Sequence, residues 1–327
     1  MVNLCLTLAA GSVSELQKKI ERYDGQVPFI EVRLDFLDPF DFPVLPAGSS
    51  TLYLATCRPS REGGRFSDSE ADRLRILQES PGFGFSLVDL EADLDSIPAF
   101  PEGIRIIRSS HFFGQTARSP RELYREISRL KGTFCKLALT PGNTSELLEL
   151  LKCMEECLPH TPGVVLGMGK MAQITRLLGP FLGGAWTYVS EEDQAVAPGQ
   201  FSLSQARRFY GLPERTCIPR LYGLAGRIDD ALIDRATEAL NQAFFRKGVE
   251  AMAFPLPGVG LNEFYEYAVA SRLPYSGFIR LKEAAGIETD TRDAEIIRPG
   301  PDGLMNSKSE ITTDRDWVDN IIEFWSE

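Results

Sequence analysis

The chain has 327 residues, which is long for one domain and enough for a barrel-sized domain followed by a smaller one. Its formal net charge of −11 argues against a nucleic-acid or anionic-membrane partner, because phosphate groups are bound by cationic faces. No apolar run reaches the roughly 20 residues of a membrane-spanning helix, and the first residues lack the basic segment of an export signal, so we expect a cytoplasmic protein.

Short apolar runs typical of β-strands alternate with amphipathic stretches over the first 210 residues or so. The predicted strands are Asn3–Leu8, Phe29–Leu34, Thr51–Cys57, Phe85–Leu90, Ile104–Ser109, Thr133–Leu139, Gly163–Met168 and Ala185–Val189. Helix signals fill most of the intervals, as at Ser12–Tyr23, Ser67–Leu77, Pro120–Lys131 and Thr144–Cys157. Alternating strands and helices imply parallel pairing, and eight such units predict a (β/α)8 TIM barrel rather than an open doubly wound sheet.

A break in this pattern follows at residues 211–220, where proline, glycine and charged residues cluster. Beyond it, a helical stretch is predicted over residues 230–247 and a strand-like one over residues 249–257. We therefore predict an α/β fold in two parts, a TIM barrel over residues 1–212 and a smaller α/β domain over residues 219–327.

Polar and ionisable residues recur where the predicted strands end, which is where TIM barrels carry their active sites. They come from six different strands and are Glu31, Arg33, Asp35, Arg58, Glu62, His111, Lys136, Met168, Arg176 and Gln200. A solvated surface would not explain so many polar groups converging on one rim. The pattern predicts one active site there.

Lys136 lies between Phe134-Cys135 and Leu137-Ala138-Leu139, so it either extends to solvent or is buried for a purpose. We predict that it points into the barrel. Burial and nearby cations such as Arg33 or Arg58 would favour a neutral amine that can attack a ketone.

His111 is one of two histidines and follows the fifth predicted strand, so it is the candidate for proton transfer. His160 is interpreted as a loop residue. Glu62 could orient the His111 ring, and a structural ion pair with Arg58 is the alternative for that glutamate.

Neither a metal nor a dinucleotide is expected. Cys153 and Cys157 lie one helical turn apart, but no histidine or second cysteine pair completes a zinc site. Residues 167–172 satisfy the GxGxxA spacing of a dinucleotide-binding loop. Six strand units precede that motif, however, whereas a dinucleotide fingerprint usually opens its domain.

These residues fall into six short motifs that occur together in one order. They are Glu31-Val-Arg33-Leu-Asp35, Thr56-Cys-Arg58-Pro-Ser-Arg-Glu62-Gly-Gly, Ser110-His111-Phe112, Lys136-Leu-Ala138, Met168-Gly169…Thr175-Arg176 and Ala197-Pro198-Gly199-Gln200. Together they resemble the type I 3-dehydroquinate dehydratases across nearly all of the first 210 residues. The resemblance implies a cofactor-free hydro-lyase of the shikimate pathway that acts on 3-dehydroquinate.

The resemblance also implies a role for each motif residue. Lys136 would form a Schiff base with the substrate ketone, and His111, positioned by Glu62, would transfer the protons. Substrate binding would fall to Arg33, Arg58, Met168, Arg176 and Gln200, with Glu31 holding the arginine network. Val196 stands where a serine commonly contacts substrate, which removes one binding hydrogen bond.

Residues from about 219 onward resemble the substrate-binding domain of shikimate dehydrogenase, in a degenerate form. Lys282 and Asp314 match the catalytic pair of that enzyme by position, but the histidine-and-serine signature is replaced by residues 227–234. We expect no oxidation of shikimate and a folded relic or docking domain. Its apolar C-terminal residues, among them Trp317 and Trp325, would be costly to leave in water, so we expect the segment to pack on itself, on the barrel or on the partner subunit of a homodimer.

Two other functions remain open at this stage. A class I aldolase would also use a lysine imine, but it would leave the Glu-Arg-Asp and APGQ motifs unexplained. A non-catalytic scaffold would fit the altered second domain, but it would not require Lys136, His111 and Arg176 together. Because every predicted catalytic group precedes residue 215, truncation there should leave the dehydratase chemistry in place.

Overall fold

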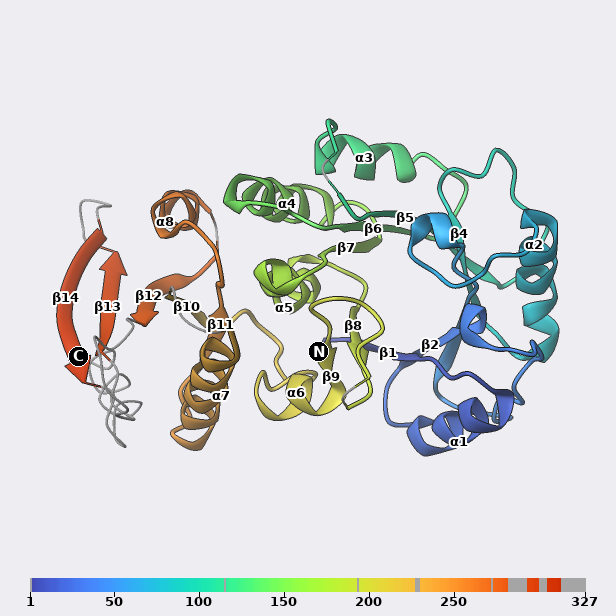
Figure 1. The fold of residues 1–327 in the computed structure, drawn as a ribbon, viewed down its shortest axis with the longest axis horizontal. Coiled ribbons are helices and arrows are strands. Elements are labelled where there is room, and N and C mark those ends of the chain that lie inside the picture. The colour runs from blue at the N-terminus through green and yellow to red at the C-terminus, as the bar shows by residue number, and fades with distance from the viewer. Residues whose placement is uncertain are drawn as a thin grey trace.

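The computed structural model describes residues 2–114, 116–192, 194–226, 230–271, 273–281, 293–299 and 305–312. Its larger sheet has nine strands in the order β7-β6-β5-β4-β3-β2-β1-β8-β9, and every pair in it is parallel. These strands are β1 (Leu4–Leu8), β2 (Phe29–Arg33), β3 (Leu52–Thr56), β4 (Leu87–Glu91), β5 (Arg105–Phe112), β6 (Phe134–Leu139), β7 (Gly163–Gly167), β8 (Thr187–Ser190) and β9 (Phe201–Ser202). The placement of β8 beside β1 gives the strand order of a TIM barrel, as the sequence predicts (Figure 1).

Helices follow most of the strands and cover the outside of this sheet. They are α1 (Val13–Tyr23), α2 (Glu70–Glu79), α3 (Pro120–Ile127), α4 (Thr144–Cys157), α5 (Gln173–Leu178) and α6 (Leu203–Arg208). The short 3-10 helices are η1 (Leu34–Phe36), η2 (Ser60–Glu62), η3 (Ser80–Phe83), η4 (Lys170–Ala172) and η5 (Gly179–Leu182).

Local sequence sets where these helices begin. The side chains of Ser12, Ser119 and Asn143 each accept a hydrogen bond from a backbone N–H of the first turn. In α3 a capping box with Glu122 satisfies the reciprocal donor. Strands such as β1 and β7 are mostly apolar because a parallel strand is buried on both faces.

The segment after β8 leads to a short ninth strand that the sequence analysis does not predict. The eighth strand ends at Ser190, and residues 191–200 form a loop before the short strand β9. We call residues 191–200, of which residue 193 lies outside the described part, the rim loop. Near the start of β8, the backbone N–H of Ala185 donates to the carbonyl of Gly163 (2.8 Å), which joins the last barrel strand to β7.

A second, five-stranded sheet follows in the order β11-β10-β12-β13-β14. Its strands are β10 (Arg220–Gly226), β11 (Ala251–Pro255), β12 (Tyr275–Leu281), β13 (Asp293–Pro299) and β14 (Met305–Thr312), and its helices are α7 (Asp230–Arg246) and α8 (Leu261–Ala270). The first three strands are parallel, and β13 and β14 add an antiparallel hairpin. This confirms the prediction of a smaller α/β unit after the barrel.

The second sheet packs against the α4–α5 side of the barrel, where α8 lies beside α4 and β11 beside α5 (Figure 1). Leu177 of α5 and Phe254 of β11 belong to one buried apolar cluster. The backbone N–H of Gly260 donates to Thr144 Oγ1 (2.7 Å) across the same boundary. The two sheets are therefore joined by apolar contact and by this hydrogen bond. The domain boundaries predicted at residues 212 and 219 stay predictions.

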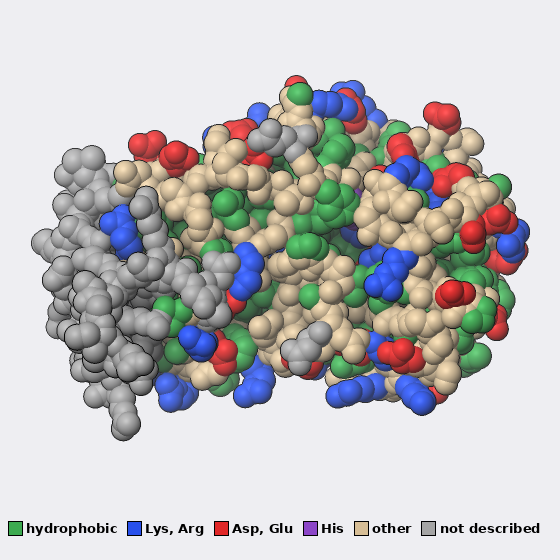
Figure 2. All heavy atoms as spheres, in the orientation of Figure 1, with side chains coloured by type: hydrophobic (Ala, Val, Ile, Leu, Met, Phe, Trp, Pro, Cys, Tyr) green, Lys and Arg blue, Asp and Glu red, His purple; other side chains and the backbone are tan. Residues whose placement is uncertain are grey.

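The outer surface carries both signs of charge. Figure 2 shows acidic and basic side chains interspersed over the face in view. Within the part of the chain that the structure describes, no helix is both long and apolar enough to pass through a membrane.

Candidate active site

One cavity of about 130 Å³ opens where the barrel strands end. All the residues that the sequence analysis assigned to catalysis or substrate binding line it, namely Lys136, His111, Glu62, Glu31, Arg33, Arg58, Met168, Arg176 and Gln200. They lie on six of the barrel strands or on the segments that follow them. The structure thus brings the predicted set together, while the role of each residue stays a prediction.

Lys136 is buried in the floor of the cavity, with 6% of its surface exposed. Its Nζ donates to Asp89 Oδ2 (3.1 Å), lies 3.6 Å from Glu31 Oε1 and sits 4.4 Å from the centre of the Tyr188 ring. It comes from β6, where it is paired with Ser109 of β5. The amine is therefore held in place and separated from bulk water, as a nucleophile that forms an imine needs.

The charges beside Lys136 differ from the sequence-based expectation. Nearby cations such as Arg33 or Arg58 were expected, but the groups closest to Nζ are the carboxylates of Asp89 and Glu31. Glu31 is itself fixed by hydrogen bonds from Thr7 Oγ1 and Thr56 Oγ1, both 2.9 Å. Anions in these positions stabilise any cation on Nζ, whether an ammonium or an iminium.

Arg58 connects Asp89 to a second buried carboxylate. Its guanidinium contacts Asp89 Oδ2 (2.7 Å) and Glu91 Oε1 (2.6 Å), and it also donates to Ser109 Oγ (2.8 Å). Burial would lower the pKa of Arg58, but Asp89 and Glu91 outweigh it and hold that pKa well above its usual value. Burial opposes the ionised form of Asp89, yet Arg58 and Lys136 lower its pKa, so Asp89 stays an anion.

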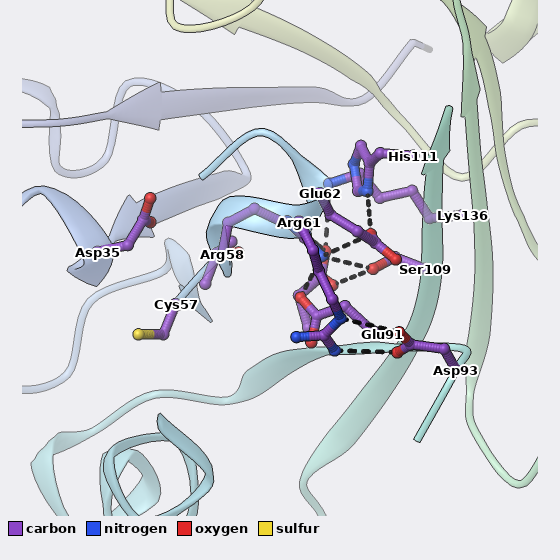
Figure 3. Close-up of polar contacts among 12 residues, drawn as sticks. Asp35, Cys57, Arg58, Arg61, Glu62, Glu91, Asp93, Ser109, His111 and Lys136 are labelled. Atoms are coloured by element: carbon purple, nitrogen blue, oxygen red, sulfur yellow. Dashed lines mark hydrogen bonds and ion pairs between the residues drawn. The ribbon is translucent and has the colours of Figure 1, made fainter. Parts of the chain in front are cut away.

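His111 faces the cavity two residues beyond Ser109 on β5, and it is paired with Ala138 of β6. Its Nδ1 lies 2.9 Å from Glu62 Oε2, the geometry expected of an orienting carboxyl group (Figure 3). Burial and the positive charge of Arg58 lower the pKa of His111 well below its usual value. Burial raises the pKa of Glu62 to about 8 against the opposing effect of Arg58. Both groups are therefore neutral at pH 7, and the tautomer with its proton on Nδ1 can accept a proton at Nε2.

Glu62 Oε2 also lies 3.7 Å from Arg58 Nη1, so the contact with that arginine, the alternative from the sequence, is present as well. The contact with His111 is the shorter one. At the outer edge of this cluster, Arg61 forms a two-point contact with Asp93, at 2.9 and 3.1 Å (Figure 3).

Arg176 is a buried cation without an acidic partner in the described part of the chain. It is 2% exposed, its Nη2 makes one long hydrogen bond to the carbonyl of Pro198 (3.4 Å), and its Nε has no acceptor. Burial lowers its pKa to about 10, which still leaves it charged at neutral pH. A buried charge without a counter-ion is costly, so the cavity is suited to an anionic ligand.

Arg33, in contrast, is already paired. Its guanidinium makes a two-point contact with Asp35, at 2.9 and 2.8 Å, and lies 4.9 Å from the Phe36 ring centre. Such a fixed guanidinium can still donate its remaining N–H groups to a ligand. Arg33 and Arg176 differ in that only Arg33 is neutralised by an acidic side chain.

The rim loop covers one side of the cavity and is folded around Gln200. The amide oxygen of Gln200 accepts from the N–H groups of Val196 and Ala197, both 3.3 Å, and its Nε2 donates to Thr7 (3.2 Å). Gly199 has a φ of +76°, and a side chain there would collide with the carbonyl of Gly169 (2.5 Å). Gln200 therefore shapes the loop, and Val196 presents an apolar side chain to the cavity.

The family model for type I 3-dehydroquinases matches residues 4–216, which is the whole barrel and about two thirds of the chain. The chain belongs to the type I 3-dehydroquinase family. Members of this family are hydro-lyases, and the matched residues include all those that line the cavity.

Curated relatives agree with this assignment. A 3-dehydroquinate dehydratase of Streptococcus equi subsp. zooepidemicus is 29% identical over 220 residues, covering 62% of this chain and 94% of the relative. A 3-dehydroquinate dehydratase of Dehalococcoides mccartyi is 30% identical over 192 residues, covering 56% of this chain and 84% of the relative.

Solved structures show the same fold. The 3-dehydroquinate dehydratase of Geobacillus kaustophilus aligns with a TM-score of 0.53 at 24% identity, over 63% of this chain and 89% of that one. The dehydroquinate dehydratase and shikimate dehydrogenase of S. pombe aligns with a TM-score of 0.52 at 16% identity, over 95% of this chain and 64% of that one. The second alignment extends over the second sheet as well as the barrel.

Sequence reasoning missed the contribution of the fourth strand. Asp89 and Glu91 are 1% and 0% exposed and provide the carboxylates that hold Lys136, Arg58 and Arg73. The available signal was two acids at alternate positions of an otherwise apolar strand, because alternate residues face the same side of a sheet. Tyr188, whose ring lies against Lys136, gave no such signal.

Two other candidates from the sequence, the GxGxxA motif and the second site, have different outcomes. The GxGxxA motif lies at the turn from β7 to η4, and Gly167 is needed there because a side chain would collide with Ala172 (2.2 Å). Lys282 and Asp314, the proposed degenerate second site, lie outside the described residues. Among the described residues, no group of three His, Cys, Asp or Glu side chains is arranged to hold a metal ion.

Proposed function

We propose that this chain dehydrates 3-dehydroquinate to 3-dehydroshikimate through a Schiff base on Lys136. The observation that carries the proposal is the buried Lys136 amine in the same cavity as a neutral histidine and an arginine that has no acidic partner among the described residues. These three groups supply a nucleophile, a proton carrier and a carboxylate-binding site. The proposed dehydration of 3-dehydroquinate needs all three groups.

In the first step, Lys136 Nζ attacks the substrate ketone, and the carbinolamine loses its oxygen as water to give an iminium. The Glu31 carboxylate, 3.6 Å from Nζ, can take the proton that the amine gives up and return it to the carbinolamine hydroxyl, which then leaves as water. The iminium carries the same positive charge as the ammonium. Asp89, 3.1 Å from Nζ, therefore stabilises it without rearrangement.

In the second step, His111 Nε2 removes the proton from C2, which the iminium acidifies by accepting the electron pair as an enamine. The enamine then returns that pair, and the C1 hydroxyl leaves as water after taking the proton from His111. Glu62 holds Nδ1 throughout (2.9 Å) and so keeps Nε2 aimed at the substrate. Hydrolysis of the conjugated imine releases the product and the Lys136 amine.

Binding follows from the charges that remain unmatched. Arg176 is the proposed partner of the substrate carboxylate, because its N–H groups lack a strong acceptor. Arg33, Arg58 and Gln200 would bind hydroxyl oxygens with donors not used internally, and Met168 would pack against the carbon ring. A cytoplasmic location and a homodimer remain predictions from the sequence.

We also propose that the second unit is a shikimate dehydrogenase-like substrate-binding domain that does not oxidise shikimate. The alignment with the S. pombe protein over 95% of the chain supports the likeness of fold. The substituted signature at residues 227–234 supports the lack of activity. Reduction of 3-dehydroshikimate by the full chain with either nicotinamide cofactor would contradict this proposal.

The direct test is to incubate purified chain with 3-dehydroquinate and follow the absorbance of the conjugated enone product. The proposal predicts a rise whose rate is proportional to protein concentration. A folded chain that gives no rise, or one that cleaves a carbon–carbon bond of the substrate instead, would overturn it.

A further inference from the structure

Lys19 is a lysine in the core-facing stripe of α1. The buried positions of this helix are Leu16, Lys19, Ile20 and Tyr23, spaced to face the barrel, and Lys19 is 8% exposed. The neighbouring Lys18 faces solvent. Because a buried ammonium is costly unless several acceptors surround it, the partners of Lys19 need an explanation.

The partners lie on the rim loop. Lys19 Nζ contacts Glu191 Oε2 (2.6 Å) and Gln194 Oε1 (2.6 Å), and it also donates to the carbonyl of Ala9 (2.8 Å). Glu15, exposed on the same helix, lies 3.5 Å away. Glu191 is buried and follows directly on Ser190, the last residue of β8. Lys19 thus ties the start of the rim loop to the first strand-helix unit of the barrel.

A second cavity explains why this tie matters. It measures about 260 Å³, is lined by Ala9, Glu191 and Gln194 among others, and shares Val196 with the active-site cavity. The rim loop therefore has little packed core beneath it on this side. Its position depends on polar contacts, with Lys19 at its start and Gln200 at its end.

The other end of the rim loop touches the active site. Val196, Ala197, Pro198 and Gln200 line the active-site cavity, and the carbonyl of Pro198 is the acceptor of the Arg176 contact. A shift at Glu191 would therefore move the groups that surround the substrate. The Lys19 ammonium itself is bound by partners outside the residues that line this cavity.

We propose that Lys19 is a positioning residue, which holds the rim loop in its substrate-binding conformation through Glu191 and Gln194. The proposal rests on the proposed dehydratase function for its kinetic test. Without Lys19, the buried Glu191 carboxylate would lose its counter-charge and move toward water. The loop would then spend only part of its time in the binding conformation, and apparent affinity falls by that fraction.

The kinetic test compares Lys19→Met with Lys18→Met, which removes the same charge from the adjacent, exposed position. We expect Lys19→Met to raise KM for 3-dehydroquinate by about 3- to 10-fold while kcat changes by less than about twofold, as for lost uniform binding. Lys18→Met should leave both constants unchanged. Lys19→Arg should recover part of the loss, because it restores the cation.

Glu191→Gln serves as a second variant that keeps Lys19 packed. We expect a smaller rise in KM than for Lys19→Met, and no further rise when the two changes are combined, because both break the same contact. A KM for Lys19→Met equal to that for Lys18→Met would overturn the proposal. So would a lower melting temperature with unchanged kinetic constants, since that result marks a purely structural lysine.

Amide hydrogen exchange of the peptide spanning residues 191–200 separates this proposal from the proposed function. Lys19→Met should speed exchange in that peptide and Lys18→Met should not, whatever reaction the chain catalyses. If the wild-type chain is inactive but this difference in exchange appears, the dehydratase assignment fails and the anchoring role stands. Unchanged exchange in a folded Lys19→Met variant would overturn the anchoring role.

Discussion

The two sheets of this protein bury different kinds of polar group. The barrel buries charged side chains at its strand ends, including Glu31, Arg58, Asp89, Glu91 and Lys136. In the described part of the second unit, the buried polar side chains are Thr237 and Asn241. Thr237 donates to the carbonyl of Ile233 (2.7 Å), and Asn241 pairs with both backbone groups of Ala253 (2.9 and 2.8 Å).

This difference separates polar groups that support a fold from those that support a reaction. Neutral polar groups that satisfy backbone donors and acceptors stabilise a fold at little cost. Buried charges are expensive, and replacing them by apolar residues often stabilises a protein, so their concentration in the barrel needs another reason. The proposed site, which would form a cation on Lys136 and bind an anion at Arg176, supplies that reason.

The largest effect is expected from Lys136→Ala. Removing the nucleophile should lower kcat by at least about 10⁴-fold, the scale seen when a covalent catalyst loses its nucleophile. Steady-state assay of enone formation measures it, with Lys131→Ala, exposed between α3 and β6, as the control. A Lys136→Ala variant that turns over at the parental rate would place the chemistry elsewhere.

His111→Ala should have the next largest effect. Loss of the proton carrier should slow turnover by about 10²–10⁴-fold, the usual contribution of general acid–base catalysis. The amine of Lys136 remains, so borohydride should still trap the substrate on it. If a folded His111→Ala variant loses trapping as well as turnover, His111 serves binding or structure instead.

Arg176→Leu should act mainly on binding. A hydrogen bond to a charged group contributes about 1.5–3 kcal/mol, so kcat/KM should fall by roughly 10- to 150-fold, chiefly through KM. Arg75→Leu, which removes an exposed arginine on α2, should change neither constant. An unchanged KM in Arg176→Leu would mean that the substrate carboxylate binds elsewhere in the cavity.

The pH dependence of kcat/KM tests the His111–Glu62 pair. With His111 as the proposed base, activity should be lost as pH falls through its pKa, which burial and Arg58 place below 6.5. Glu62 has its pKa raised to about 8 and should add an inflection there. Glu62→Gln should remove the inflection near pH 8 and keep the acid limb below pH 6.5. An acid limb at or above pH 6.5 in the wild type would contradict the assigned neutral imidazole.

Phe254→Ala should have the smallest effect on turnover. Phe254 is fully buried on β11, so its loss should lower the free energy of unfolding by about 3–5 kcal/mol. Turnover per folded molecule should stay within about twofold. Phe245→Ala, on the exposed side of α7, controls for loss of a phenyl ring. Chemical denaturation and active-site titration measure the two quantities, and a loss of kcat per folded molecule would mean that the second sheet shapes the site.

Phe254→Ala tests the division of labour more directly than truncation near residue 215 does. Leu177 and Phe254 share one buried cluster, so truncation would expose apolar surface of the barrel. Loss of activity after truncation could then follow from misfolding alone. A single buried substitution leaves the boundary between the sheets in place.

The barrel and most of its site could be predicted from the sequence because each strand carries a local signal. Lys136 is conspicuous among apolar neighbours, and His111 is one of only two histidines. Apolar runs and helix signals predicted the order of the eight barrel strands and of helices α1 to α4, and α4 was predicted with the bounds that the structure has.

Other features depend on contacts between distant segments and left no local pattern. Lys136 has its closest partner on β4, which lies between β3 and β5 in the sheet, and no pattern near Lys136 in the sequence predicts this contact. Lys19 contacts Glu191, a residue far from it in the chain. From the sequence of α1 alone, Lys19 would be taken for one more exposed lysine. The apolar boundary between the two sheets likewise could not be predicted, because the pattern of one helix does not say which other element its apolar face packs against.

Borohydride trapping on the intact wild-type chain tests the central claim most directly. With 3-dehydroquinate present, reduction should inactivate the chain and add the mass of one reduced imine adduct. The adduct should map to the peptide that contains Lys136. Lys19 and Lys170 should stay unmodified, because Nζ of Lys19 is engaged by the rim loop and Lys170 lies on the surface beside Asp234. Turnover of 3-dehydroquinate without an adduct, or an adduct on a lysine other than Lys136, would contradict the account.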